Sequence, residues 1–371
     1  MSDWKNCKNI LVIRADNMGD LLMSSPAIRA LKETFGCRIT LLTSAMGQVI
    51  APFLKEIDET IVADLPWVKT EHPLDEADFK KLVQQLKKLQ FDAAVIFTVY
   101  SQNPLPAAML AYLAAIPYRL AYCRENPYHL LSDWMVEKEP YTFIQHQVKR
   151  DLQLVKMIGA ETEDPHIKII FSEKAKEAAL KKLSESGVDV GKDWLIMHPG
   201  VSETKREYPE SSWIETGKLI REKLGKQVLI TGSSSDEELC NRIRQGIGDK
   251  SFSLAGLFSI EEFIALISIA PLVISVNTGT AHIAAATQTP VIVLYALTNP
   301  QHTPWLVNSS VLFFSVKEDL RSKNEIVNYV TQQLMEKTVD PPNASQIVEE
   351  AKKLLSVGKL SDSENSHSVK Q

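Results

Sequence analysis

Short apolar runs alternate along this chain with longer segments in which apolar residues recur every three or four positions. Such an alternation predicts short buried strands connected by amphipathic helices. In the first half, the pattern predicts strands at residues 10–13, 38–42, 93–97 and 118–122, and helices at 27–35, 78–89, 105–115 and 148–159. Pro26 is expected in the first turn of the helix that follows it. This half therefore predicts a parallel sheet covered by helices.

The pattern is interrupted between about residues 160 and 193, where a charged loop and a strongly charged helix at 172–186 resemble an interdomain connection. The alternation then restarts. It predicts strands at 194–197, 227–231, 272–276 and 291–295, and helices at 213–224, 236–247, 259–269, 324–337 and 345–355. A helix of small residues is expected between the last two of these strands. The Ser-rich, polar stretch 356–371 is predicted to be disordered.

Two such runs predict an α/β protein with two Rossmann-like, doubly wound domains that face each other across a cleft. The expected division is an N-terminal domain at 1–165, a C-terminal domain at 166–340, a closing helix at 341–355 and the tail at 356–371.

Composition narrows the class of protein. The 371 residues are 44% hydrophobic and 23% charged, which is ordinary for a globular protein. The net charge of −5 disfavours nonspecific binding of nucleic acid. The four cysteines lie far apart, so neither a zinc site nor a disulfide framework is expected. No secretory pattern and no run of ~18 apolar residues occurs, so we expect a cytoplasmic protein without a transmembrane segment. Peripheral contact with a membrane stays open.

The segment 272–302 carries the most specific chemistry. Its strand, helix and strand form a βαβ unit, and ligands bind outside the carboxyl ends of such parallel strands. The turn Asn277-Thr278-Gly279-Thr280 lies at one of these ends. Gly279 permits a close approach of the backbone to a ligand, and the start of the next helix favours an anion. His282 on that helix is either a ligand-binding residue or an ordinary buried histidine.

A second polar loop, residues 14–20, follows the first strand. Its only glycine is Gly19, so it lacks the Gly-x-Gly-x-x-Gly pattern of nicotinamide-binding domains. This absence disfavours an oxidoreductase. Asp20 is either a functional carboxylate or a cap of the following helix.

Two further loops follow strands of the second domain. Residues 198–206 combine hydroxyls, Gly200 and the adjacent cations Lys205 and Arg206, which suit a diphosphate. The alternative is a solvated loop with surface charges. In residues 231–238, Asp236 or Glu237 could accept hydrogen bonds from ribose hydroxyls, with helix capping as the alternative.

Taken in order, these loops resemble glycosyltransferase family 9, the lipopolysaccharide heptosyltransferase family. The resemblance is carried by Met18-Gly19-Asp20 after a basic residue, by His198-Pro199-Gly200 with Lys205 downstream, and by Thr278-Gly279 followed by His282. It spans roughly residues 9–305.

The resemblance implies a GT-B fold and an inverting, metal-independent transfer from a nucleotide-diphospho-sugar, typically ADP-heptose. No Asp-x-Asp sequence occurs, and no cofactor is expected. The implied acceptor is a lipid-linked, lipopolysaccharide-type glycan at the inner membrane. By the same resemblance, Asp20 is the general base. The donor is bound by Ser202, Thr204, Lys205, Asp236, Glu237, Asn277, Thr278, Gly279 and His282.

One position departs from the family pattern. The better-known members have Asp where this chain has Asn277, and that carboxylate is expected to accept hydrogen bonds from the sugar. An amide accepts through one atom and donates through the other. The departure leaves two alternatives: a member that uses a donor other than heptose, or a catalytically silent protein that binds sugar nucleotides.

Overall fold

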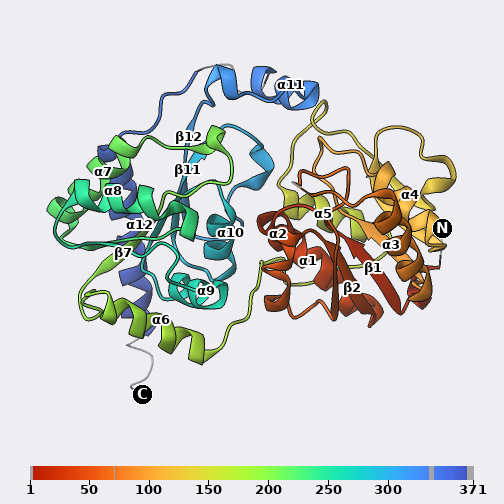
Figure 1. Ribbon diagram of the computed structural model, residues 1–371, viewed down its shortest axis with the longest axis horizontal. Coiled ribbons are helices and arrows are strands. Elements are labelled where there is room, and N and C mark those ends of the chain that lie inside the picture. The colour runs from red at the N-terminus through yellow and green to blue at the C-terminus, as the bar shows by residue number, and fades with distance from the viewer. Residues whose placement is uncertain (1–2, 71, 334–337, 366–371) are drawn as a thin grey trace. The chain divides into compact units, whose positions relative to one another are not determined.

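The computed structural model describes residues 3–70, 72–333 and 338–365. The chain divides into two compact units, each with its own core. Unit 1 comprises residues 1–170 and 324–330, and unit 2 comprises residues 171–323 and 331–371. In Figure 1 the main part of unit 1 runs from red to yellow-green and that of unit 2 from green to blue.

The core of unit 1 is built on a parallel sheet in the order β3-β2-β1-β4-β5-β6. Helices α3 and α4 pack on the face that carries Leu11 and Ile13, where they bury residues such as Leu86 and Leu110. Helices α1 and α5 contact each other extensively. The strands are β1 (Asn9–Ile13), β2 (Arg38–Thr43), β3 (Glu59–Val62), β4 (Ala93–Ile96), β5 (Tyr118–Cys123) and β6 (Asp133–Val136).

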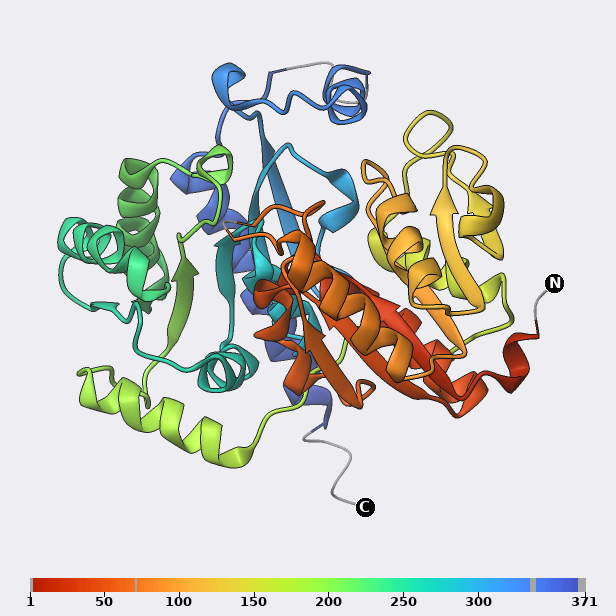
Figure 2. The ribbon, with the colours of Figure 1, turned by 45° about the vertical axis from the view of Figure 1, so that its right-hand side comes forward.

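Unit 2 repeats this topology in a second parallel sheet, with the order β12-β11-β10-β7-β8-β9. Helices α7, α8 and α12 cover one face, where Trp213, Ile243 and Ile347 join the same buried cluster. The strands are β7 (Trp194–His198), β8 (Gln227–Ile230), β9 (Ser251–Ser253), β10 (Val273–Val276), β11 (Val291–Ala296) and β12 (Ser309–Phe314). Figure 2 shows the strands of each unit together with the helices around them.

Each sheet therefore has the doubly wound order, and the predicted α/β class with two Rossmann-like units is confirmed. The helices are α1 (Met18–Phe35), α2 (Ala45–Gln48), α3 (Glu76–Lys88), α4 (Leu105–Leu113), α5 (Gln147–Lys156), α6 (Glu173–Glu185), α7 (Glu210–Leu219), α8 (Glu237–Ile247), α9 (Ile260–Ser268), α10 (Gly279–Ala286), α11 (Glu325–Gln333) and α12 (Ala344–Asn365).

Helix α1 corrects the predicted position of Pro26. The helix begins at Met18, well before residue 27, and Pro26 lies in its interior. A proline there cannot donate the backbone hydrogen bond to Leu22. The hydroxyl of Ser25 donates to the Leu22 carbonyl oxygen instead, at 2.8 Å. The Ser25 side chain thus satisfies the Leu22 carbonyl oxygen, which has no backbone N–H partner because residue 26 is proline.

The last helices also differ from the prediction. The helix expected at 324–337 is α11, and residues 334–337 of that range lie outside the described residues. Helix α12 continues to Asn365, through much of the stretch predicted to be disordered. This stretch contains no proline to stop a helix. Within the described ranges, none of the helices is both long and apolar enough to cross a bilayer.

Candidate active site

Three of the four predicted functional loops lie at the point of a sheet where the strand order reverses, and the fourth, residues 231–238, follows the neighbouring strand β8. This point is between β1 and β4 in unit 1, and between β7 and β10 in unit 2. Asp20 lies in the loop and helix start after β1, His198 ends β7 and Asn277 follows β10. Doubly wound sheets bind ligands at such points because the loops there diverge to opposite faces. Each unit thus offers one such site of its own.

In unit 1, the carboxylate of Asp20 is held at the start of α1. Asn17 is the N-cap residue of this helix, and Asp20 occupies its third position as the partner in a capping box. One carboxylate oxygen accepts from the Asn17 N–H at 3.3 Å, and the other lies 3.2 Å from a guanidinium nitrogen of Arg14. The side chain keeps 13% of its exposure. Capping is therefore a real role of Asp20, and it leaves the side chain partly accessible.

Beneath Asp20 lies a buried group of charges around Arg14. Its guanidinium also pairs with Asp16 at 3.4 Å. Burial opposes ionisation of Arg14, but the charges of Asp16, Asp20 and Asp151 outweigh it and raise the pKa of the guanidinium. Burial raises the pKa of Asp16, and it raises the pKa of Asp151 to about 6, although Arg14 acts in the opposite direction on both.

In unit 2, His198 is a neutral side chain at the end of β7. Burial lowers its pKa to about 4. One ring nitrogen lies 3.0 Å from the hydroxyl oxygen of Thr231 at the end of β8, and the ring packs against Phe263. A histidine in this state contributes hydrogen bonding and shape to the strand ends, without positive charge.

The loops after β7 and β8 approach each other closely at Gly200. A Cβ at this position would lie 2.5 Å from a carboxylate oxygen of Asp236, so a larger residue would displace the Asp236 side chain. The same Asp236 oxygen accepts from the backbone N–H and the hydroxyl of Ser233 at 2.8 and 2.6 Å. Asp236 is thus engaged in the local turn, whereas Glu237 is exposed at the first position of α8.

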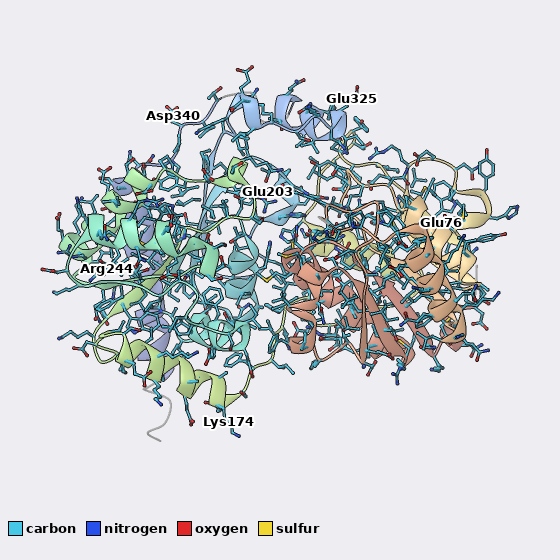
Figure 3. All side chains as sticks on the ribbon, viewed as in Figure 1. Glu76, Lys174, Glu203, Arg244, Glu325 and Asp340 are labelled. Atoms are coloured by element: carbon cyan, nitrogen blue, oxygen red, sulfur yellow. The ribbon has the colours of Figure 1, made fainter. Side chains whose placement is uncertain are left out.

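The predicted cation segment forms a short 3₁₀ turn, η4 (Thr204–Arg206). Glu203, labelled in Figure 3, pairs with both cations, at 3.2 Å from Lys205 and 2.9 Å from Arg206. Arg206 also donates to the Asn277 carbonyl oxygen at 3.0 Å, which ties this segment to the turn after β10. Ser202 and Thr204 are exposed beside them.

Asn277 connects β10 to the end of β11 through its side-chain amide. The amide nitrogen donates to the Ala296 carbonyl oxygen at 3.3 Å and to the Thr298 hydroxyl at 3.1 Å. The amide oxygen accepts from the Ala296 N–H at 3.2 Å. With 8% exposure and both donors in use, the side chain retains at most one lone pair of its oxygen for a sugar.

The start of α10 lies beside this connection. Thr278 is its N-cap residue and Gly279 its first residue, and both are half-buried. His282 is buried on the same helix. Its ring centroid lies 6.5 Å from that of His302, which belongs to the turn η7 (Pro300–His302) after β11.

Sequence reasoning assigned no role to Arg14 or His302, and it named Arg206 as a diphosphate-binding cation beside Lys205 without its contact to Asn277. Arg14 was visible as a cation in a candidate loop, but the nearby charge of Asp151 is far away in sequence. His302 was visible as part of the polar loop after the second strand of the βαβ unit. Its proximity to His282 depends on how α10 packs against the sheet.

Comparison with known proteins agrees with this fold. The model of glycosyltransferase family 9 (heptosyltransferase) matches residues 79–330. Lipooligosaccharide heptosyltransferase 2 of Haemophilus influenzae is 26% identical over 328 residues, which are 84% of this chain and 90% of the relative. Lipopolysaccharide heptosyltransferase 2 of Salmonella typhimurium is 25% identical over 310 residues, which are 80% of this chain and 84% of the relative.

Solved structures show the same architecture. A family 9 glycosyltransferase of Veillonella parvula superposes with a TM-score of 0.73 at 17% identity, over 94% of this chain and 97% of its own. Escherichia coli ADP-heptose lipopolysaccharide heptosyltransferase II superposes with a TM-score of 0.70 at 20% identity, over 95% of this chain and 99% of its own.

Two Rossmann-like units of this kind define the GT-B class of fold. Within that class the chain belongs to glycosyltransferase family 9, and it is a glycosyltransferase. The resemblance inferred from the sequence loops is confirmed.

Proposed function

We propose that this enzyme transfers heptose from ADP-heptose to a lipopolysaccharide core acceptor, with inversion at the anomeric carbon and without a metal ion. The family match, together with relatives that are lipopolysaccharide or lipooligosaccharide heptosyltransferases, carries the proposal. The acceptor is a lipid-linked glycan, which the enzyme meets at the cytoplasmic face of the inner membrane.

Unit 2 is the proposed donor-binding unit. Lys205 and the N-terminus of α10 stabilise the negative charge that develops on the leaving diphosphate, in place of a metal ion. Ser202 and Thr204 donate hydrogen bonds to the diphosphate from their exposed hydroxyls, while Thr278, Gly279 and His282 contact the donor. For the ribose we favour Glu237, because an Asp236 oxygen already accepts twice from Ser233.

Unit 1 supplies the proposed general base, Asp20. Its carboxylate takes the proton of an acceptor hydroxyl while that oxygen attacks the anomeric carbon. The new carbon–oxygen bond forms on the face opposite the diphosphate, and the bond to the diphosphate breaks. The products are the extended glycan, ADP and a protonated Asp20, which then loses its proton to water.

The experiment compares Asp20→Asn with the wild type, using ADP-heptose and a heptose-free acceptor. Turnover should fall by roughly 10²–10⁴, while the dissociation constant of ADP stays unchanged. Asp75→Asn is the matched control, because Asp75 also caps a helix of unit 1, with a 2.8 Å bond to the Asp78 N–H. Full turnover in Asp20→Asn would show that Asp20 caps α1 and is not the general base.

Two further measurements test the donor side. Lys205→Ala should weaken ADP and the donor together, since the lost contact is to phosphate. Excess EDTA should leave turnover unchanged; loss with EDTA and recovery with Mg²⁺ would contradict the metal-independent mechanism. ADP-heptose binding without any transfer would instead identify a silent binding protein.

A further inference from the structure

Arg14 has no role in the chemistry proposed above, yet it is fully buried beneath Asp20. We propose that Arg14 is a positioning residue, which holds the Asp20 carboxylate in the orientation that proton transfer requires. This inference rests on the proposed role of Asp20 as the general base.

The backbone of Arg14 is fixed at the end of β1. Its N–H donates to the Leu42 carbonyl oxygen at 3.0 Å, and its own carbonyl oxygen accepts from the Thr43 hydroxyl at 2.8 Å. Both partners belong to the neighbouring strand β2. Because the side chain is also buried, the guanidinium has little freedom to follow a carboxylate that moves.

The other carboxylates around the guanidinium are themselves held by neutral groups. Asp16 accepts from the Gln102 amide at 2.6 Å. On α5, Asp151 accepts from Ser24 at 2.7 Å and from Gln147 at 2.8 Å. A second cation nearby is Arg150, also on α5, whose positive charge disfavours that of Arg14. Its guanidinium pairs with Glu137 and Glu139, so it does not substitute for Arg14.

The Asp20 carboxylate is contacted by the start of α1 and by Arg14. The contacts with the Asn17 N–H, at 3.3 Å, and with Arg14, at 3.2 Å, have nearly the same length, so they differ in charge and not in distance. The contact with Arg14 is charge-assisted and comes from a guanidinium that is fixed in place. Without Arg14, the Asp20 carboxylate would gain rotational freedom, and the buried charges of Asp16 and Asp151 would lose their cation.

The proposal therefore predicts a loss in turnover that depends on Asp20. Arg14→Met should lower kcat by roughly 10- to 100-fold, the effect of a misplaced catalytic group. The dissociation constant of ADP should not change, because ADP is assigned to unit 2. In an Asp20→Asn background, the same Arg14→Met change should have little further effect on kcat, because the group that it positions is already inactive.

Arg29→Met is the matched control for removing a buried arginine. Arg29 lies on α1 and pairs with Glu56 at 2.8 Å. Its loss should lower thermal stability. It should change kcat per folded molecule by less than about threefold, because a factor of three is less than about 1 kcal/mol of activation free energy. If Arg14→Met does not fold, Arg14→Lys serves instead. A lysine keeps the charge but lacks the fork that contacts two carboxylates, so kcat should fall less, and again only when Asp20 is present.

Wild-type kcat in a folded Arg14→Met or Arg14→Lys enzyme would overturn the inference. An equal loss of kcat from Arg14→Met in the wild-type and Asp20→Asn backgrounds would also overturn the inference, since that result indicates a structural role of Arg14. Failure of the proposed function is distinguishable, because it appears as full turnover in the single variant Asp20→Asn.

Discussion

At the scale of single residues, position 277 shows how a hydrogen-bond requirement selects between an amide and a carboxylate. The Asn277 side chain must donate twice and accept once to connect β10 with the segment after β11. An aspartate can only accept. In this chain the amide is therefore explained by the fold of unit 2, before any contact with a sugar is considered.

Asn277→Asp should accordingly destabilise the protein. The carboxylate would face the Ala296 carbonyl oxygen without a hydrogen between them, at a cost of about 1–3 kcal/mol for a buried group left unsatisfied. Thermal unfolding measures this loss, and Asn126→Asp, at an exposed turn, is the control. A shift in donor preference toward ADP-heptose with unchanged stability would instead support the alternative that this side chain contacts the sugar and selects the donor.

The buried carboxyl of Asp151 predicts a pH dependence of stability. Its folded pKa of about 6 lies above the ordinary value of 3.8, so between these pH values the folded state binds more protons than the unfolded state. Stability from this group therefore falls as the pH rises through that window.

Asp151→Asn removes the titration but can keep the contacts with Ser24 and Gln147. Its free energy of unfolding should match that of the wild type near pH 4. Relative to the wild type it should then rise to a plateau above pH 6, on the order of 3 kcal/mol. Denaturation at several pH values measures the difference in free energy of unfolding between the two proteins. Titration of His198 contributes equally to both proteins and therefore drops out of this difference. A difference that is constant with pH would contradict the assignment.

At the scale of secondary-structure elements, the contact between α7 and α8 depends on two glycines. A Cβ at Gly246 would lie 2.5–2.9 Å from three side-chain atoms of Ile214. At Gly217 it would collide with Ile247. Each helix thus inserts an isoleucine where the other has no side chain, and this close approach sets how α7 and α8 cover the sheet.

Gly246→Ala should therefore lower the melting temperature. Alanine gains up to about 1 kcal/mol in helix propensity, but overpacking typically costs about 1–3 kcal/mol. Because three atoms of Ile214 must move, we expect the cost to exceed the gain. Gly191→Ala is the control, since its nearest neighbour is at 3.4 Å. A higher melting temperature for Gly246→Ala would show that Ile214 can rotate away.

At the scale of the whole molecule, each unit has its own buried cluster and its own complete sheet. A ligand that binds one unit should therefore stabilise that unit first. Hydrogen exchange with saturating ADP should slow in peptides from residues 171–323, most at the ends of β7 and β10. Peptides from residues 3–70 should exchange unchanged. Protection confined to the latter would place the nucleotide in unit 1 and contradict the donor assignment.

The sequence predicts the central strands of both sheets and omits the edge strands. All four omitted strands, β3, β6, β9 and β12, lie at a sheet edge. Edge strands are partly solvated, so their sequences mix polar and apolar residues, whereas central strands are continuous apolar runs. β3 (Glu59–Val62) is mostly exposed or half-buried, while every residue of β4 (Ala93–Ile96) is buried.

For the candidate site, the sequence by itself determined the loops. Hydroxyls, glycines and charges placed directly after apolar strands identify Asp20, Lys205 and Gly279 as residues at the ligand-binding edge, because parallel strands end at a common edge. Only the tertiary structure decided what surrounds those residues. The contacts of Ser24 with the buried Asp151, and of Arg206 with Asn277, join segments that are distant in sequence. Local pattern carries no information about such pairs, since helix packing and strand order bring them together.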